Sequence, residues 1–151
     1  MHSLSAVPEF DEYPDVSTVR LLKFKSFSAE TGTLIPVTAQ KDVPFGIKRV
    51  FFVLAPKLNG ERGDHAHIVC QQVLMATSGA CDVVVDDGQS TREFTLRTPD
   101  VALFIPALIW ARQKYLTKDT VITVFCDQPY DERDYVRDYS AFRLLREPKA
   151  A

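Results

Sequence analysis

The sequence predicts an all-β fold, and three observations indicate it. Short runs of β-branched and aromatic residues with period-2 alternation recur between turn-forming residues along most of the chain. The stretch CDVVVDDGQSTREFTL has β-branched runs on both sides of Asp87-Gly88, which is typical of a hairpin with positive φ at its turn. Helical periodicity is confined to the C-terminal end. Together these features favour a β-sandwich or barrel with one short C-terminal helix.

The expected strands follow one another with little else between them. The turn-prone segments SAETG, KDVPFG and APKLNGERG separate them, and Pro106 marks a bend or an edge. In chain order, the strand segments are VRLLKFKSF, TLIPVTA, IKRVFFVL, HAHIVCQQVLMATSG (one or two strands), CDVVVDDGQSTREFTL, VALFIPALIWARQKYL and TVITVFCDQ. The sequence therefore predicts roughly seven to ten short strands. The natural candidate for such a pattern is a jelly roll, as in the cupins.

The C-terminal segment DERDYVRDYSAFRLLRE has the spacing of an amphipathic helix. Its apolar positions are separated by four, three and three residues and are Tyr135, Tyr139, Phe142 and Leu145. Asp131 or Asp134 is the candidate N-cap. We expect the charges of this helix to face solvent and its tyrosines to pack on the barrel, and we assign the segment no chemistry.

Length and charge limit the domain organisation and the partners. The chain has 151 residues and a net charge of −2, which predicts one domain and gives no case for a nucleic-acid surface or an anionic membrane. Residues 1–17 are acidic and contain proline, so we expect an N-terminal arm, followed by a single domain over residues 18–147. No apolar run approaches the roughly 20 residues that cross a bilayer. The N-terminal residues also lack the order of a secretory signal.

Cysteine usage points to the cytoplasm. Cys70, Cys81 and Cys126 are widely spaced, lie inside apolar runs and form no Cys-x-x-Cys motif. We therefore expect buried thiols in a reducing compartment. No local signature marks any of the three as a reactive cysteine.

Two of the three histidines stand in RGDHAH, one residue apart. Period 2 places His65 and His67 on the same face of a strand, so both can converge on one point inside a barrel. Metal-binding cupins continue such a pair with a glutamate, but here Gln71 or Gln72 takes that position. A histidine is also absent from IPALIWARQKY, where a second metal motif is expected. Two imidazoles and two amides are a poor set of ligands, so we predict no metal and no cofactor.

The histidine pair can instead carry protons. One alternative is that both side chains are satisfied residues of the core or its rim. Clustered polar groups on an interior face are costly unless they bind something, which favours a functional role. Imidazole titrates near neutral pH, so the pair suits proton abstraction next to a carbonyl.

Several motifs in order resemble one family. They are RGDHAH with the downstream QVL and SG, the hairpin VVVDDG, VPFGIKRV, the spacing from Pro106 to Trp110, and PYDERDYVRDYSAF. Together they are similar to the sugar-nucleotide 3,4-ketoisomerases, small cupins that act on dTDP-4-keto-6-deoxyglucose. The resemblance covers residues 18–145. It implies an isomerase that moves the keto group from C4 to C3 without a metal, and a cytoplasmic homodimer with exchanged N-terminal strands.

The resemblance also implies roles for individual residues. His65 and His67 correspond to the family's histidine pair, with one as base or shuttle and the other as a donor to the developing oxyanion; we favour His67 as the residue nearer the sugar. Arg62 corresponds to the arginine before the pair. Arg62, Arg49 and Arg112 are the candidate ligands of the diphosphate. Gln72 or Gln71 is expected to bond a sugar hydroxyl or a histidine nitrogen.

Other features leave alternatives open. Trp110 could stack on the base or sugar, or pack in the core. Some family members have a histidine directly after this tryptophan, where Ala111 stands here, and some have tyrosines where Phe51 and Phe52 stand. The rival functions are a catalytically silent dTDP-sugar-binding module, a C3/C5 epimerase and a metal-dependent cupin enzyme.

Overall fold

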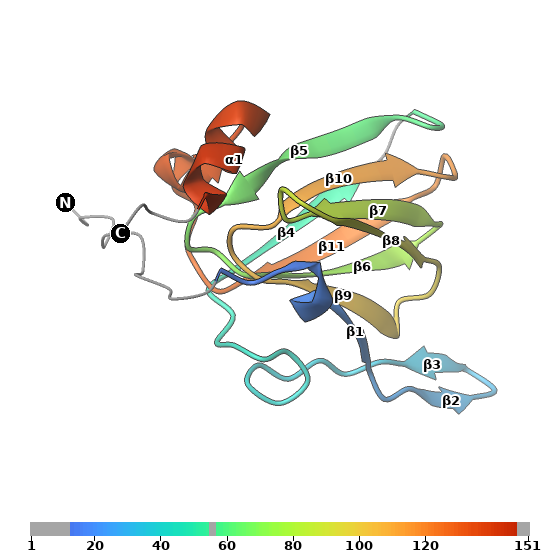
Figure 1. The fold of residues 1–151 in the computed structure, drawn as a ribbon. Helices are drawn as coiled ribbons and strands as arrows, with labels where there is room; N and C mark the ends of the chain where they lie inside the picture. Colours follow the sequence, from blue (N-terminus) through green and yellow to red (C-terminus); the bar gives the residue numbers. More distant parts are fainter. Residues whose placement is uncertain (1–12, 55–56, 148–151) are drawn as a thin grey trace.

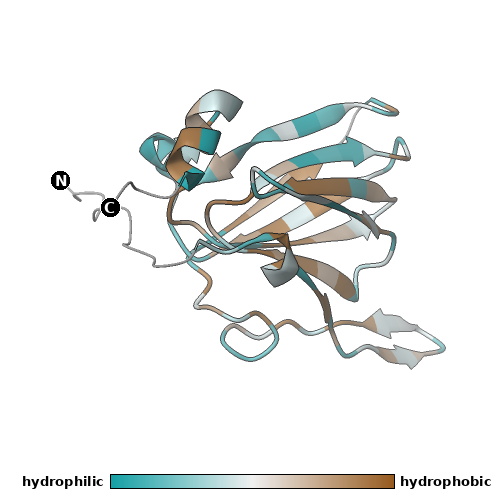
Figure 2. Ribbon diagram, viewed as in Figure 1, coloured by the Kyte–Doolittle hydropathy of each residue, from teal (hydrophilic) through white to brown (hydrophobic). Residues whose placement is uncertain are grey.

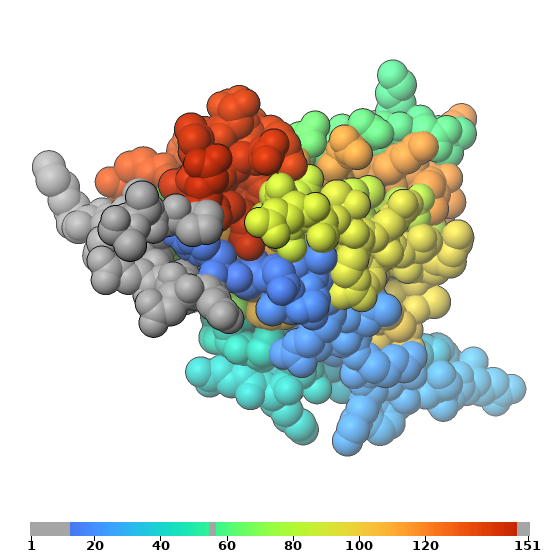
Figure 3. All heavy atoms as spheres, in the orientation of Figure 1, coloured from blue at the N-terminus to red at the C-terminus, as the bar shows by residue number. Residues whose placement is uncertain are grey.

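Two five-stranded antiparallel sheets stack face to face in the computed structural model, which describes residues 13–54 and 57–147 (Figure 1). In spatial order, the first sheet contains β1 (Arg20–Lys23), β9 (Val101–Ile105), β6 (Gln72–Ser78), β11 (Val121–Cys126) and β4 (Arg49–Leu54). The second contains β12 (Tyr135–Val136), β5 (Glu61–His67), β10 (Trp110–Tyr115), β7 (Cys81–Asp86) and β8 (Thr91–Leu96). A separate hairpin of β2 (Phe27–Ala29) and β3 (Gly32–Leu34) protrudes from the body (Figures 1 and 3). The all-β prediction is confirmed.

The hairpin of β7 and β8 forms where the sequence predicts it. Strand β7 alternates buried and half-buried residues, as period 2 requires of a strand with one face on the core. Gly88 has φ +92°, a conformation that glycine adopts without strain. The Asp87 carboxylate accepts hydrogen bonds from the amides of Gln89 and Ser90 in the turn and from the amide of Val16. The turn therefore also holds the N-terminal segment.

Two expectations for strands need correction. The segment TLIPVTA contributes only its first residues to a strand, because β3 ends at Leu34 and Pro36 has no N–H for a ladder. The chain that follows covers the outer face of the first sheet, where Val43 and Phe45 are buried together with Phe24. The polar segment APKLNGERG is not wholly a loop, since β5 begins at Glu61.

The C-terminal helix is shorter than its periodicity indicates. Helix α1 spans Tyr139–Arg146, and its N-cap is Asp138, whose carboxylate accepts from the amide of Ala141. The predicted cap Asp131 instead caps the short 3-10 helix Glu132–Asp134. The expectation of helix at Tyr135 is wrong, because this residue lies in β12, which pairs with the end of β5.

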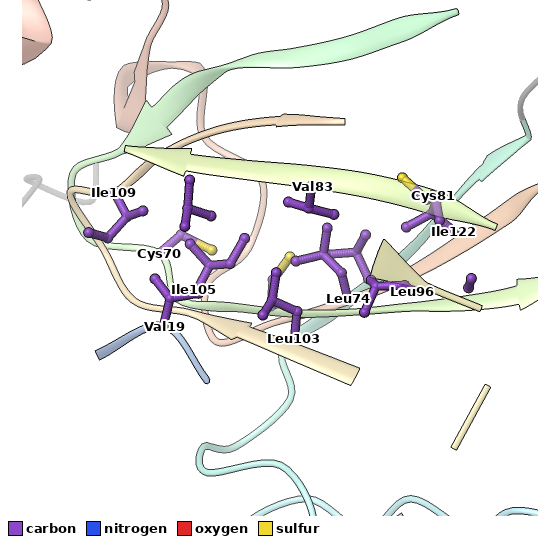
Figure 4. Close-up of a cluster of buried hydrophobic side chains, with 14 of the residues drawn as sticks. Val19, Cys70, Leu74, Cys81, Val83, Leu96, Leu103, Ile105, Ile109 and Ile122 are labelled. Carbon is purple, nitrogen blue, oxygen red and sulfur yellow. The ribbon is translucent and has the colours of Figure 1, made fainter. Parts of the chain in front are cut away.

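The main core lies between the two sheets. Leu74, Val83 and Leu103 point into this space from β6, β7 and β9, and Cys70 points into it from the segment before β6 (Figure 4). The middle of β7 is strongly hydrophobic because it consists of three valines, whereas most of β5 is hydrophilic (Figure 2). A second cluster joins Phe142 of α1 to Ala66, Trp110 and Val136 on the outer face of the second sheet.

Part of the predicted N-terminal arm, residues 1–12, lies outside the described residues. The rest is anchored: Val16, and Val19 just after the arm, are buried, and the Arg92 guanidinium donates to both of their carbonyl oxygens at 3.0 Å. Within residues 13–54 and 57–147, no helix has the length and apolar character needed to cross a membrane.

Candidate active site

His65 and His67 both border a small cavity between the two sheets. The imidazole centroids are 4.9 Å apart with the rings nearly perpendicular. The cavity measures about 20 Å³, which is room for about one water molecule. Its other lining residues come from β5 itself, from β6, β9 and β10, and from adjoining loops, and are Gly63, Cys70, Gln72, Leu74, Ile105, Pro106, Ile109, Ala111 and Gln113. The prediction that the two histidines share one interior face is confirmed.

A β-bulge in β5 shapes this face. Gly63 and Asp64 have φ of +91° and +58°, and the pairing of β5 with β10 shifts register at this point. A Cβ at residue 63 would lie 2.9 Å from the carbonyl oxygen of Ala111, so glycine is required there. The bulge pairs Arg62 with Gln113 and His65 with Ala111. Because opposed residues of an antiparallel pair share a face, exposed Arg62 lies on the same side of the sheet as the histidines.

Asp134 holds His67 in one orientation. Nδ1 of His67 lies 2.9 Å from Oδ2 of Asp134, and both side chains are buried. Oδ1 of Asp134 accepts from the amide of Val69 at 2.7 Å. Burial opposes ionisation of Asp134, but the hydrogen bonds from His67 and Val69 outweigh it and lower the pKa of the carboxyl. An ionised Asp134 requires the proton of a neutral His67 to sit on Nδ1, which leaves Nε2 with a free lone pair.

His65 lies in a setting that keeps it neutral. Burial, together with the charge of His67, lowers the pKa of His65 to about 4. The Tyr135 ring packs beside both histidines, with centroids 4.4 Å from His67 and 5.0 Å from His65. The guanidinium of Arg137 lies over this tyrosine, 4.5 Å from the ring centroid. At neutral pH His65 can therefore accept a proton or donate its neutral N–H.

Three buried side-chain nitrogen atoms have no hydrogen-bond partner within residues 13–54 and 57–147. They are His67 Nε2, His65 Nδ1 and Arg49 Nε, and no other buried side-chain nitrogen or oxygen of these residues shares this property. Arg49 begins β4, and its guanidinium lies over the rings of Phe51 and Tyr130. Its Nη2 donates to the Cys126 sulfur at 3.5 Å. Buried polar atoms are nearly always satisfied, so these exceptions make the histidines and Arg49 the candidate place for a polar ligand.

The two glutamines that follow the histidines have different partners, and only one of them lines the cavity. Gln72 lines the cavity, and its side-chain amide donates to the Cys126 sulfur at 3.6 Å. Gln71 is bound to Asp127 through both its backbone and its side-chain amide. Of the two, only Gln72 joins the histidines. Gln113, which the sequence does not place in the site, also lines the cavity. Its side-chain carbonyl oxygen accepts a hydrogen bond from the Tyr115 hydroxyl.

Trp110 and Arg112 do not join the histidine site. Period 2 in β10 directs Ala111 and Gln113 to the cavity and the two predicted residues to the opposite face. There they line an outer groove of about 420 Å³ beneath α1. The indole N–H of Trp110 donates a hydrogen bond to Asp64 at 3.2 Å, and its ring packs edge-on against Tyr139. Of the two alternatives for this tryptophan, the structure therefore favours packing in the protein. The structure therefore separates these two residues from the histidines by the thickness of β10, and their role as substrate ligands stays a prediction.

Among the residues that the structure describes, His67, Cys70 and Asp134 form the group that comes nearest to a metal site. Their ligand atoms lie within 4.8 Å of one another, and all three residues are buried. Both oxygens of Asp134 already accept hydrogen bonds. The Cys70 thiol donates to the carbonyl oxygen of Gln71 at 3.4 Å. These residues therefore fit a hydrogen-bonded cluster better than an ion.

The sequence alone assigns no chemistry to Asp134 and Tyr135. Their segment carries alternating charges and aromatic residues, which favoured a helix with solvated charges. The only available signal was an acidic residue next to a tyrosine in a segment far along the chain from the histidines. Long-range pairing of β12 with β5 brings them together, and this pairing has no local signature.

Comparison with known proteins gives consistent matches. The family model described as FdtA: WxcM-like, C-terminal matches residues 17–147. The TDP-4-oxo-6-deoxy-alpha-D-glucose-3,4-oxoisomerase of Aneurinibacillus thermoaerophilus is 36% identical over 124 residues, which cover 82% of this chain and 89% of that protein.

Solved structures agree with the sequence matches. A mutant of the 3,4-ketoisomerase QdtA from Thermoanaerobacterium thermosaccharolyticum, in complex with TDP-4-keto-6-deoxyglucose, superposes with a TM-score of 0.82 and 30% identity over 85% of this chain and 93% of that one. A 3,4-ketoisomerase from Helicobacter canadensis gives a TM-score of 0.82 and 30% identity over 85% and 97%.

Proposed function

The chain belongs to the FdtA family of WxcM-like proteins, and we propose that it is a sugar-nucleotide 3,4-ketoisomerase acting on dTDP-4-keto-6-deoxy-D-glucose. The reaction moves the keto group from C4 to C3 by acid–base chemistry of the histidine pair. The names of its relatives support the substrate class, since they act on or bind TDP-linked keto-deoxyglucose.

One observation supports the chemistry most directly. Unsatisfied buried nitrogens occur on His65, His67 and Arg49, which are residues that can exchange a proton with a sugar or bind its diphosphate. Leaving such atoms unpaired in the free protein is costly, and a polar ligand removes that cost. A purely structural role for the histidines gives no reason for this arrangement.

The ketone at C4 makes the hydrogen on C3 acidic. His67 Nε2 takes this proton, because Asp134 keeps the other ring nitrogen protonated and stabilises the imidazolium that forms. The electrons of the C3–H bond form a C3–C4 double bond, and the negative charge moves to the oxygen on C4. This step gives an enediolate.

Completing the isomerisation requires a proton at C4 and loss of the hydroxyl proton on C3. The imidazolium of His67 exchanges its proton with solvent and then protonates C4, while the electrons of the C3 oxygen re-form a carbonyl. His65 is neutral at pH 7 and can carry the proton between the two sugar oxygens. Its ring lies in contact with the ring of His67, so both proton transfers occur on one side of the sugar.

Arg49 and Arg62 are the candidate ligands of the diphosphate. Arg49 lies in the first sheet across from the histidines and keeps an unpaired Nε. Arg62 is exposed on the histidine side of β5. A guanidinium meets phosphate oxygens in a fork, which suits both positions. Gln72 is placed to bond a sugar hydroxyl at the cavity wall.

The reaction can be followed directly by NMR. We expect purified protein to convert dTDP-4-keto-6-deoxyglucose into the 3-keto isomer, with deuterium at C4 when the solvent is D2O. Conversion should be unchanged after extensive treatment with chelator. Deuterium at C5 would show epimerase chemistry instead, binding without conversion would show a silent module, and loss of activity with chelator would show metal dependence.

We further propose a cytoplasmic homodimer with exchanged N-terminal strands. Two sets of exposed apolar side chains support an interface: Phe27 and Leu34 on the β2–β3 hairpin, and Val50, Phe52 and Leu54 on the edge strand β4. The three cysteines are free thiols, as expected in a reducing compartment. Analytical ultracentrifugation should give a dimer, and Phe27→Asp with Phe52→Asp should weaken it. A wild-type monomer at micromolar concentration would contradict the proposal.

A further inference from the structure

Tyr135 contacts both histidines, and the reaction described above gives it no role. Its ring centroid lies 4.4 Å from that of His67 and 5.0 Å from that of His65. In the pairing of β12 with β5, Tyr135 stands directly opposite His67, so the two side chains leave the sheet on the same face. Because the hydroxyl belongs to this ring, a sugar that contacts His67 lies within its reach.

The hydroxyl of Tyr135 is available to a ligand. Within the part of the chain that the structure describes, it has no hydrogen-bond partner. The buried side-chain polar atoms without a partner in this part of the chain are three nitrogens, so the unpaired oxygen of half-buried Tyr135 reaches solvent. Two neighbouring tyrosines differ: the Tyr130 hydroxyl donates to Glu132 at 2.7 Å, and the Tyr115 hydroxyl donates to Gln113 at 3.2 Å.

The cavity beside the histidines has no hydroxyl group of its own. None of the residues that line it is a serine, threonine or tyrosine. Phe51 shares the half-buried face of β4 with Arg49, whose guanidinium lies over its ring, and it offers no O–H either. Among the residues that the structure describes, Tyr135 is therefore the candidate for a neutral O–H donor next to the histidine pair.

Two neighbours hold the Tyr135 ring in place. The guanidinium of Arg137 lies over it at 4.5 Å, and two hydrogen bonds of 2.8 and 3.1 Å tie that guanidinium to Glu132. The ring of Tyr130 lies 5.8 Å away, and the guanidinium of Arg49 lies over this second ring at 5.6 Å. The Tyr135 ring is thus positioned before a ligand binds, which is what an oxyanion donor needs in order to be effective.

We propose that the Tyr135 hydroxyl donates a hydrogen bond to the oxygen on C4 of the sugar and stabilises the negative charge that develops there when His67 removes the C3 proton. This inference rests on the proposed function and adds a residue to it. No proton leaves the tyrosine, because the bond is made to the ketone oxygen and strengthens as that oxygen becomes an enolate. His65 remains free to carry the proton between the two sugar oxygens.

Removing the hydroxyl alone tests this role. Tyr135→Phe keeps the ring against the histidines, and we expect kcat to fall about 100-fold, with loss of the C3 proton in D2O slowed by the same factor. The charge appears only as the reaction proceeds, so KM, the affinity for dTDP and the melting temperature should stay near their wild-type values.

Tyr139→Phe is the matched control. It also removes one tyrosine hydroxyl and keeps the ring, but this hydroxyl donates to Asp86 in the outer groove, on the other face of the second sheet. We expect this variant to convert the sugar and to exchange the C3 proton at the wild-type rate.

Three outcomes would overturn the proposal. Full activity of Tyr135→Phe would show that only the ring matters, equal losses in Tyr135→Phe and Tyr139→Phe would show a general effect of removing hydroxyls, and a large fall in melting temperature or dTDP affinity would show a structural role. An active wild type with an active Tyr135→Phe contradicts this inference alone. A wild type that neither converts the sugar nor exchanges its C3 proton contradicts the proposed function, and the inference with it.

Discussion

His67 Nδ1 and Asp134 Oδ2 are 2.9 Å apart although the two residues are separated by 67 positions in the sequence. Strand β12 creates this contact, because Tyr135 pairs with His67 at the end of β5 and the preceding residue then lies beside the imidazole. A buried carboxylate that fixes the tautomer of a histidine is a general device for making a base. The site therefore depends on a long-range strand pairing as much as on the His-x-His motif.

Asp134→Asn should lower kcat about 100-fold with little change in KM. The amide keeps the size of the side chain but can offer N–H to Nδ1, which favours the tautomer whose Nε2 is protonated and cannot act as a base. Steady-state kinetics with a thermal melt checks this. Asp131→Asn is the matched control, since Asp131 is paired with Arg133 outside the site. Equal losses in the two variants would show a merely structural role for Asp134.

Stability should fall as the pH decreases from 6.5 to about 4. The folded pKa of His65 is about 4, below its ordinary value of 6.5, so in this range the unfolded chain binds a proton at His65 that the folded chain does not. The stability that the neutral His65 gives the folded state is fully present above pH 6.5 and is lost as the pH falls to about 4. Urea unfolding of wild type and His65→Gln at pH 7 and pH 4.5 measures it, and the variant should lose less stability. Identical pH dependence in both proteins would contradict the burial of a neutral His65.

Gly63→Ala should destabilise the fold by about 1–3 kcal/mol and reduce activity as well. The residue has φ +91°, and the added Cβ would lie 2.9 Å from the carbonyl oxygen of Ala111, so the bulge must deform. Gly46→Ala is the control, because its Cβ would meet nothing closer than 3.8 Å. Urea denaturation and kinetics check both variants. A neutral Gly63→Ala would mean that the bulge does not set the register of Arg62 and His65.

Arg49→Gln should raise KM for the dTDP-sugar about tenfold, because a phosphate contact of this kind is worth a little over 1 kcal/mol. Arg112→Gln should leave KM unchanged, since Arg112 lies in the groove on the opposite face of β10. Measuring KM for both variants and for dTDP as an inhibitor compares the two faces. A large effect of Arg112 would place the nucleotide in the outer groove.

Local patterns predicted the strands and the shared face of the histidine pair, because period 2 and the Asp87-Gly88 turn depend only on neighbouring residues. They could not tell which phase of β10 faces the cavity, so they do not show that Trp110 and Arg112 lie on the face opposite the histidines. The bulge at Gly63 is also invisible to strict alternation, which would put Arg62 and His65 on opposite faces.

The segment around Asp134 shows a second limit of sequence patterns. Its aromatic spacing fits a helix from residue 135 onward, but pairing with β5 outweighs that local preference and confines α1 to Tyr139–Arg146. Helix propensity is a weak prior when tertiary contacts compete with it. Sequence patterns therefore predict a surface charge at Asp134, although its carboxylate makes a buried contact with a histidine 67 positions away.

Hydrogen exchange at C3 of the bound sugar tests the account most directly. The substrate is incubated in D2O with wild type, His67→Asn and His65→Asn, and loss of the C3 proton and gain of deuterium at C4 are followed by NMR. We expect exchange with wild type and none with His67→Asn, although that variant should still bind dTDP with wild-type affinity. Exchange at the wild-type rate in His67→Asn would show that Nε2 of this histidine does not carry the proton.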